Sequence, residues 1–368
     1  MFEIASEVLR WHRSNETGVV ARVVSVNGLA TRWPAQAIAA TGRAHGTVGT
    51  ILASVADPQL LPLISNALGQ GRDGSMGIPW ATAQVVDVMV PDQQANAAGL
   101  ACGGSARVLV QPTTDVPDIA WRVLADREPI CLVTDLSGAG VGHTSWFTLE
   151  SLASGHDSHV GGGAARHTES MVRLFGRGRS TTAASSLANG SEVLVDALWP
   201  APRLLVVGDG VVADALRALA LYLEWSVAVS TDREHCVREL EPLTRGDAVV
   251  VLSHDPELAG PTLKAALGGG AGYVGALGAR RTQAARAQWL QDHGVLPSQI
   301  AGIRGPAGLD VGARTSQEMA ISIVSEILAV RAGSNGQPLR DRPGPVHIDG
   351  LTAVPPRRDE SPLRPPPR

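Results

Sequence analysis

The stretch Leu204-Leu205-Val206-Val207-Gly208-Asp209-Gly210-Val211-Val212-Ala213 decides how the second half of this chain folds. Its four leading apolar residues predict a buried strand, and the pattern G-x-G-x-x-A then leads into a helical apolar pattern. Gly208 permits the tight turn, Gly210 lets the backbone approach a diphosphate, and Ala213 lets the helix pack closely on the strand. Because the N–H groups at the start of such a helix are free, the stretch predicts an anion site.

The residues that follow repeat the alternation of strand and helix. Strands are predicted at 226–230, 248–252 and 272–276, and helices at 211–223, 256–267, 282–293 and 315–332. Since strands and helices that alternate at this spacing form a parallel sheet covered on both faces, residues 201–332 predict an α/β, Rossmann-like domain. Asp232 lies 24 residues after Gly208, where such folds carry a carboxylate for a ribose hydroxyl. Binding of a dinucleotide stays open, because Asp209 puts another carboxylate beside the expected phosphate.

The residues before this domain show a different pattern. A helix at 2–13 and strands at 19–26, 83–89, 107–111 and 130–134 predict a smaller, mixed α+β domain over residues 1–150. Glycine, serine and histidine dominate residues 151–200, which predicts a loop-rich connection with one or two strands or a short helix. Residues 333–368 hold nine of the 24 prolines and predict an extended, disordered tail.

The composition argues against several classes of protein. With 368 residues, 44% of them hydrophobic, the chain has enough apolar material for more than one core, and its net charge of −4 argues against a nucleic-acid binder. Three cysteines without a C-x-x-C pair predict neither a disulfide framework nor a zinc site, and they favour a reducing cytoplasm. No apolar run approaches the roughly 18 residues of a membrane span. Thirty of the 31 basic residues are arginine, which we attribute to coding background, although local phosphate recognition stays open.

Polar residues follow the predicted strand at 248–252. Ser253, His254 and Asp255 lie at its carboxyl end, which is the edge where open α/β sheets bind ligands. His254 is a candidate acid, base or anion contact. Asp255 is equally typical of a helix N-cap, so a ligand site and a simple strand-end turn both stay open.

Two further loops are predicted at the same edge. Arg280 and Arg281 begin a helix, and paired guanidinium groups there suit a phosphate, although a solvated helix end has the same sequence pattern. Asp310 lies in the glycine-rich loop 305–314, where it either fixes the loop or contacts a ligand. Thr315–Glu318 reads as a capping box, so part of this region is helix architecture.

Cys102 stands in a turn of small residues, Gly99–Gly104, in the first domain. Its thiolate has the chemistry to ligate a soft metal or accept a sulfur atom, but the residues alone favour an inert thiol. Cys131 lies inside an apolar strand and Cys236 near a helix start, which favours structural roles for both.

Together these motifs resemble the XdhC/CoxI family, whose members are accessory factors of molybdenum hydroxylases such as xanthine dehydrogenase and aerobic carbon monoxide dehydrogenase. The likeness is closest over residues 202–331, and Gly308–Thr315 is its most specific run. In the first domain Cys102-Gly103-Gly104 is similar to the family motif C-G-G. Leu52 stands where a second family motif has cysteine, and Ser54 where it has glutamate, so one of the two family cysteines remains.

The resemblance implies a chaperone rather than a turnover enzyme. Such a chaperone binds molybdenum cofactor, a molybdopterin with or without a nucleotide, and holds it while its terminal sulfido ligand is installed. It then delivers the cofactor to an apo-molybdenum hydroxylase, with a cysteine desulfurase as a further partner and a homodimer left open. Cys102 becomes the first candidate for a catalytic and metal-binding residue, and the phosphate is expected at the glycine loop and at Arg280 and Arg281, in a cleft between the domains.

Two other functions stay open. An NAD(P)-dependent oxidoreductase would use the glycine loop, with His254 as proton donor, but neither tyrosine forms a Tyr-x-x-x-Lys pair with the lone lysine, Lys264. The other possibility is that the chain is a divergent nucleotide-binding paralogue without activity. Asp209 and Leu52 favour that interpretation.

Overall fold

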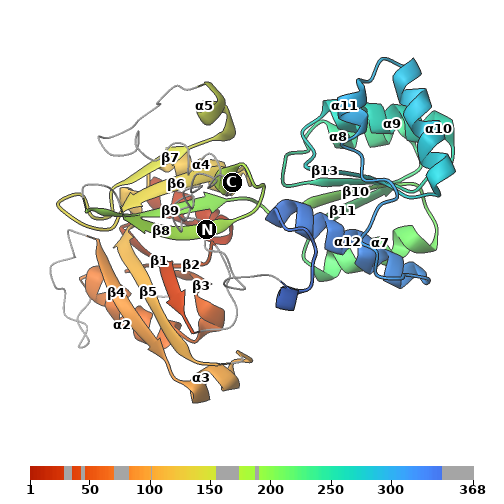
Figure 1. Ribbon diagram of the computed structural model, residues 1–368. Coiled ribbons are helices and arrows are strands. Elements are labelled where there is room, and N and C mark those ends of the chain that lie inside the picture. The colour runs from red at the N-terminus through yellow and green to blue at the C-terminus, as the bar shows by residue number, and fades with distance from the viewer. Residues whose placement is uncertain are drawn as a thin grey trace, which may run out of the picture.

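The computed structural model describes residues 1–28, 35–42, 46–69, 83–100, 102–154, 174–186 and 190–341. Its β-sheets form two groups (Figure 1): two antiparallel sheets within residues 18–198 and one parallel sheet within residues 203–276. The predicted fold class, a mixed α+β part followed by a Rossmann-like domain, is therefore confirmed. Most of the predicted tail, residues 342–368, lies outside the described residues.

The first sheet has five antiparallel strands in the order β3-β2-β1-β5-β4. The strands are β1 (Gly18–Asn27), β2 (Ala37–Thr41), β3 (Thr47–Thr50), β4 (Gln84–Val90) and β5 (Gly104–Pro112), and the helices are α1 (Phe2–Arg13), α2 (Asp57–Ala67), α3 (Asp92–Ala97) and α4 (Asp118–Ala125). Successive residues of β1 point to opposite faces. Val19 and Ala21 join the core under α2 and α3, and Val20 joins the core under α1 and α4. The sheet is thus buried on both faces.

The second sheet has four antiparallel strands in the order β7-β6-β9-β8. The strands are β6 (Ile130–Asp135), β7 (Thr144–Phe147), β8 (Thr181–Ser186) and β9 (Glu192–Leu198), and α5 (Leu149–Ser154) follows β7. β9 pairs with β6 along its whole length, from Leu198 opposite Ile130 to Val193 opposite Asp135. The segment predicted as a connection therefore contributes two strands to a sheet that begins before residue 150. A sequence pattern does not reveal such a distant antiparallel partner.

A buried arginine joins the two antiparallel sheets. Arg22 of β1 donates hydrogen bonds of 2.7 Å to the Asp196 carboxylate of β9, to the Gln111 side chain of β5 and to the Thr134 hydroxyl of β6. The side chain is 2% exposed. Burial lowers the pKa of the Arg22 guanidinium, and the charge of Asp196 opposes that effect. Because Asp196 is 174 positions away, the sequence analysis missed this pair.

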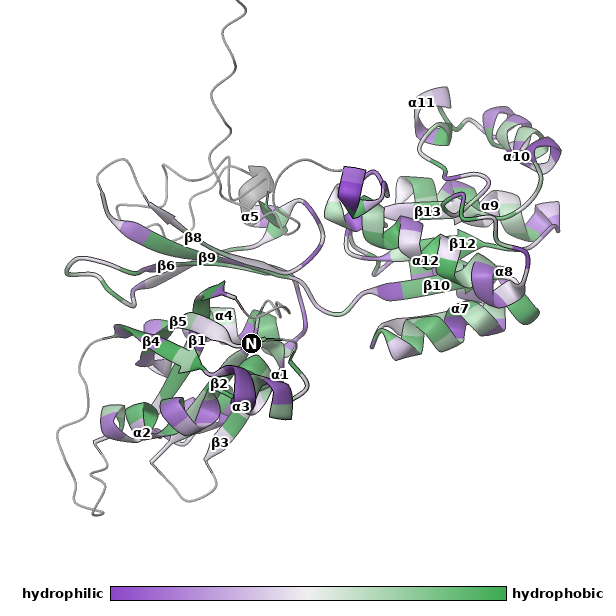
Figure 2. Ribbon diagram, turned by 60° about the horizontal axis from the view of Figure 1, so that its bottom comes forward, coloured by the Kyte–Doolittle hydropathy of each residue, from purple (hydrophilic) through white to green (hydrophobic). Residues whose placement is uncertain are grey.

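The third sheet is parallel, with the order β11-β10-β12-β13. The strands are β10 (Arg203–Val207), β11 (Ser226–Ser230), β12 (Ala248–Val251) and β13 (Tyr273–Ala276), and the helices are α7 (Val211–Tyr222), α8 (Arg233–Leu240), α9 (Pro256–Gly268), α10 (Arg280–Asp292), α11 (Pro297–Ile300) and α12 (Ser316–Ala332). Leu204 and Val206 pack under α7 and α12, and Leu205 and Val207 pack under α8, α9 and α10. These helices carry hydrophobic and hydrophilic sides (Figure 2). Within the described residues, no helix is long and apolar enough to cross a membrane.

Candidate functional site

The order of the parallel strands creates a switch point between β10 and β12. The chain leaves β10 through α7 to β11 on one side, and it later returns to β12 on the other side of β10. In open α/β sheets, the crevice for a ligand lies at the carboxyl ends of the two strands where the direction reverses. Gly208 follows β10 and Ser253 follows β12, so both of these predicted site residues lie at that crevice.

Gly208 allows the two strand ends to approach each other closely. Its φ of +119° lies in the region that favours glycine, and an added Cβ would be 2.9 Å from the backbone nitrogen of Ser253. The Ser253 N–H donates to the carbonyl oxygen of Val207 at 3.1 Å, and the Gly208 N–H donates to Ser230 at 2.8 Å. A side chain at position 208 would therefore push the β10 and β12 ends apart.

Gly210 places the start of α7 in open space. It is the N-cap residue with φ +93°, and an added Cβ would meet nothing within 4 Å. The first intrahelical bond runs from the Asp214 N–H to the Gly210 carbonyl, at 3.0 Å. The N–H groups of residues 211–213 precede that bond, and Val211 is 70% exposed. Ala213 is buried against the strand, as predicted, and the helix start is accessible to an anion.

Asp232 has a structural role of its own. It is the N-cap of α8, and its Oδ1 accepts a hydrogen bond of 2.6 Å from the backbone N–H of His235. One carboxylate oxygen is thereby used by the helix, on an exposed residue that follows β11. The predicted contact with a ribose hydroxyl would have to use the other oxygen.

The turn after β12 combines a helix cap with an exposed histidine. Asp255 is the N-cap of α9 and accepts from the Glu257 N–H at 3.0 Å, as the cap interpretation predicted. The Ser253 hydroxyl accepts from the Asp255 N–H at 3.1 Å. His254 lies between them and is exposed. The local geometry explains Asp255 fully and leaves His254 available to solvent or a ligand.

Arg286 is a residue of this edge that the sequence analysis missed. Its side chain reaches from α10 to two strand ends, where Nη2 donates to the Ser253 carbonyl at 2.7 Å and Nη1 donates to the Leu277 carbonyl at 2.6 Å. The residue is 9% exposed, and burial lowers the pKa of its guanidinium. Its spacing of four from the buried Leu290 places it on the inner side of α10, which is the signal that could have revealed it.

The paired arginines lie in the first turn of α10. The helix begins at Arg280, two residues before the predicted start, so Arg280 and Arg281 are helical and both are exposed. Gln283 of the same helix donates to the carbonyls of Ala276 and Gly278 at 2.9 and 3.1 Å, which anchors the turn that precedes them. The two arginines thus begin a helix at the same carboxyl edge as Ser253.

The loop of Asp310 is fixed by other residues. The Glu326 carboxylate accepts from the Tyr273 hydroxyl at 2.7 Å and from the Gly308 N–H at 2.8 Å. Glu318 accepts from the N–H groups of Arg314 and Thr315 in the predicted capping box. Asp310 itself is exposed. Two roles were predicted for Asp310: fixing the loop or contacting a ligand. Glu326 and Glu318 already fix the loop, so contact with a ligand stays a prediction.

Cys102 lies at a corner of the first sheet, just before β5. It is a free, partly buried thiol. The next residue, Gly103, donates to Asp92 at 2.8 Å, and an added Cβ there would clash with the backbone of Val90 and Asp92. A Cβ at Gly28 would lie 2.8 Å from the Gly103 carbonyl oxygen. The glycine that follows the cysteine is therefore required for packing.

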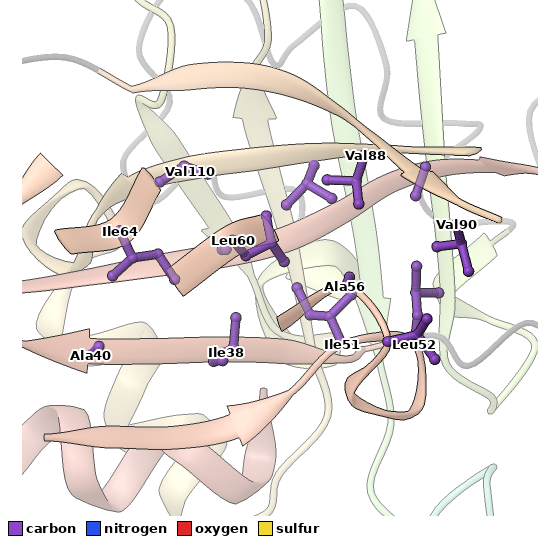
Figure 3. Packing of buried hydrophobic residues seen from close by; sticks show 14 of the residues in the cluster. Ile38, Ala40, Ile51, Leu52, Ala56, Leu60, Ile64, Val88, Val90 and Val110 are labelled. Carbon is purple, nitrogen blue, oxygen red and sulfur yellow. The ribbon is translucent and has the colours of Figure 1, made fainter. Parts of the chain in front are cut away.

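Leu52 fills the core beside the same corner. It is 2% exposed and belongs to the cluster that contains Ile51, Ala56 and Val90 (Figure 3). Leu52, Ala53 and Ser54 have φ values of +53°, +53° and +66°. For non-glycine residues this backbone costs roughly 1–2 kcal/mol per residue. The apolar side chain leaves no soft ligand where the family has cysteine.

The glycine loop and Cys102 lie in different domains and are not brought together. The first domain joins the amino end of β10, and an added Cβ at Gly246, just before β12, would be 3.1 Å from the Trp199 ring that ends the first domain. The switch-point crevice lies at the opposite, carboxyl ends of the same strands. The expectation of one cleft between the domains that holds both is therefore wrong. Among the described residues, no three histidine, cysteine or carboxylate side chains are grouped to hold a metal.

One family model and two curated proteins match parts of this chain. Residues 204–327 match the sequence model of the XdhC Rossmann domain. The molybdenum cofactor insertion chaperone PaoD of Escherichia coli (strain K12) is 31% identical over 149 residues, which are 39% of this chain and 43% of PaoD. The uncharacterized protein YqeB of the same strain is 28% identical over 194 residues, which are 46% of this chain and 35% of YqeB. The chain thus spans less than half the length of either curated relative.

A solved structure shares the overall fold. The crystal structure of a xanthine dehydrogenase from Bacillus halodurans aligns with a TM-score of 0.52 and 15% sequence identity, over 91% of this chain and 98% of that one. At this identity the alignment establishes the fold, including the antiparallel first part, and carries no argument about activity.

Proposed function

We propose, on the premise that residues 204–327 form an XdhC Rossmann domain, that this chain binds molybdenum cofactor and assists its insertion into a molybdenum hydroxylase. The resemblance to the XdhC/CoxI family is confirmed by that match and by the likeness to PaoD, which bears the name of an insertion chaperone. The molybdenum cofactor is cargo in this proposal, and the chain is an accessory protein rather than an enzyme with turnover.

The open start of α7 at the switch point is the observation that carries the proposal. The cofactor bears a phosphate, and the free N–H groups of residues 211–213 are donors for it. Gly210 leaves room for the phosphate to approach, Gly208 lets the two strand ends lie close together, and Arg280 and Arg281 add positive charge at the same edge. The site therefore suits a phosphate-bearing ligand.

Four further residues have secondary roles in this proposal. Ala213 lets α7 start close to the strand, and Ser253 lines the crevice with its hydroxyl and backbone. His254 and Asp310 are exposed on neighbouring loops and can donate to, or accept from, the part of the ligand beyond the phosphate. Asp232 would accept from a ribose if the cargo carries a nucleotide.

Cys102 is the proposed contact to the molybdenum end of the cargo or to a sulfur donor. A free, partly buried thiol suits a soft metal or a transferred sulfur atom, so sulfuration with a cysteine desulfurase is part of the proposal. Since Cys102 and the glycine loop are far apart in one chain, a homodimer in which one copy supplies the thiol to the other would unite them. The client is a hydroxylase of the xanthine dehydrogenase or carbon monoxide dehydrogenase type, and the proposed location is the cytoplasm.

A pterin assay tests the proposal. The protein is purified without oxygen from a host grown on molybdate, and bound pterin is measured after acid oxidation. We expect stoichiometric pterin in the wild type, a loss of at least tenfold in Gly210→Ala, and a loss in Cys102→Ser. Gly294→Ala is the matched control, because Gly294 also has a positive φ of +83° and open space around it but lies after α10. Equal pterin in Gly210→Ala and Gly294→Ala would contradict the phosphate site.

An NAD(P)-dependent oxidoreductase is the second candidate. Asp232 after β11 favours it, because one carboxylate oxygen is left for a ribose hydroxyl. It predicts tight binding of NADH, seen as enhanced nicotinamide fluorescence, and no pterin. Absence of both ligands would favour the third reading, a nucleotide-binding paralogue without activity.

A further inference from the structure

Arginines of the second domain hold a turn of the first domain at the amino edge of the parallel sheet. The turn Gly176–Arg179 precedes β8. Arg245 Nη1 donates to the Gly176 carbonyl at 3.1 Å, and Arg331 Nη2 of α12 donates to the Gly178 carbonyl at 3.1 Å. This edge is opposite to the switch-point crevice. The two ends of the turn are therefore bound to the second domain by cationic side chains.

Arg331 is desolvated and incompletely paired. Its guanidinium carbon lies 5.7 Å from the centroid of the Trp225 ring, and its Nε is buried with no hydrogen-bond partner among the described residues. Burial, opposed by the charge of Asp247 and assisted by the positive charge of Arg179, lowers the pKa of Arg331 to about 10. A buried donor with no acceptor is unfavourable, so Arg331 has capacity for one more acceptor.

The turn adds positive charge to the same place. Burial lowers the pKa of Arg179, as does the positive charge of Arg177, although the Arg179 side chain keeps an exposed side. Within the described ranges, no carboxylate forms a salt bridge with Arg177, Arg179 or Arg331. Asp247 is the nearest acidic influence on Arg331, raising its pKa.

The Asp247 carboxylate is already occupied. Its Oδ1 accepts from the Arg203 N–H at 2.7 Å, and its Oδ2 accepts from the N–H and hydroxyl of Thr244 at 2.7 and 2.8 Å. Arg331 donates to Gly178, the residue between Arg177 and Arg179, so the three arginines come from adjoining backbone. The nearby Asp247 carboxylate is bound to Arg203 and Thr244.

We propose that Arg177, Arg179 and Arg331 form a binding site for a phosphate group. Planar guanidinium groups bind phosphate through two N–H groups each, and a phosphate would supply both the missing negative charge and an acceptor. Its binding would join the turn of the first domain to α12 of the second. The site is separate from the switch-point crevice and does not depend on the proposed function.

Thermal unfolding in inorganic phosphate tests the site. A ligand that binds only the folded state raises the melting temperature in a saturable way. We expect that rise for the wild type in phosphate but not in sodium chloride of equal ionic strength. Arg179→Gln should need at least tenfold more phosphate for the same rise. Arg331→Lys, which keeps the charge but loses the planar fork, should be weakened as well.

Two controls make the result decisive. Arg217→Gln changes an exposed arginine of α7 and should respond to phosphate as the wild type does. All of these chains also carry Arg280→Gln/Arg281→Gln, because those two arginines belong to the crevice that is proposed above to bind a phosphate. If chloride acts like phosphate, or if Arg179→Gln and Arg331→Lys respond like the chain with Arg280→Gln/Arg281→Gln alone, the proposal is wrong.

Discussion

Arg286 and Ser253 are joined by a 2.7 Å hydrogen bond from the guanidinium Nη2 to the backbone carbonyl oxygen. Ser253 follows β12 beside the glycine loop, and the same guanidinium also donates to the Leu277 carbonyl after β13. The bond therefore fixes the distance between two loops of the candidate site. Its donor is nearly buried, so water competes little for the carbonyl groups.

Arg286→Met is expected to lower the free energy of unfolding by about 1–3 kcal/mol, because two carbonyl groups lose a charged donor. Urea denaturation at neutral pH measures the change. Arg286→Lys should recover part of the loss, since one ammonium cannot reproduce the two-carbonyl geometry. Arg281→Met, on the exposed side of α10, is the matched control and should leave the midpoint unchanged. If Arg286→Met has the same urea midpoint as that control, the two Arg286 hydrogen bonds contribute nothing to the stability of the fold.

Asp196→Ala is expected to destabilise the first domain by about 3–5 kcal/mol, because it leaves the buried Arg22 charge without its partner. The double variant Arg22→Met/Asp196→Ala should be less destabilised than Asp196→Ala alone, since no uncompensated charge remains. Denaturation of all three chains, followed by circular dichroism, measures this. If Arg22→Met/Asp196→Ala is instead less stable than Asp196→Ala, an uncompensated Arg22 charge is not the cause of the destabilisation.

The Tyr273–Glu326 bond predicts a loss of stability at alkaline pH. Burial raises the pKa of Tyr273, and the hydrogen bond to Glu326 raises it further. Between the unfolded pKa of about 10 and the higher folded value, only the unfolded state releases the proton, so stability falls as pH rises above about 10. Urea midpoints at pH 8 and pH 10.5 should fall less for Tyr273→Phe than for the wild type. The exposed Tyr222→Phe should behave like the wild type.

Leu52→Cys is expected to create a second thiol at the corner of Cys102. Leu52 belongs to the same core cluster as Val90, whose backbone borders Gly103. The smaller side chain should cost about 1–3 kcal/mol of stability. Cadmium titration, followed by thiolate absorption in the near ultraviolet, should show tighter binding than in the wild type. Leu52→Ala controls for the lost packing, and Leu52→Cys/Cys102→Ser should lose the gain if the two thiols act together.

Local patterns predicted most of the second domain. The apolar run 204–207, the two glycines and Ala213 depend on neighbours within one strand, turn and helix, so the sequence alone indicates their structure. The N-cap role of Asp255 and the capping box at Thr315 are local for the same reason. A helix start was expected near Cys236, but the bounds of α8 were not predicted, because its sequence, REHCVREL, has only three apolar residues to mark a buried side.

Sequence by itself thus determined the parallel α/β domain, the glycine turn and the open start of α7, because the spacing of apolar residues and the positive φ of glycine act within a few positions. Only the tertiary structure decided which distant groups meet. It paired β9 with β6, placed Arg286 against Ser253, bound Arg331 to Gly178, and separated Cys102 from the glycine loop. Those relationships follow from how sheets and domains pack, and burial then decides which charges are desolvated and which partners they find.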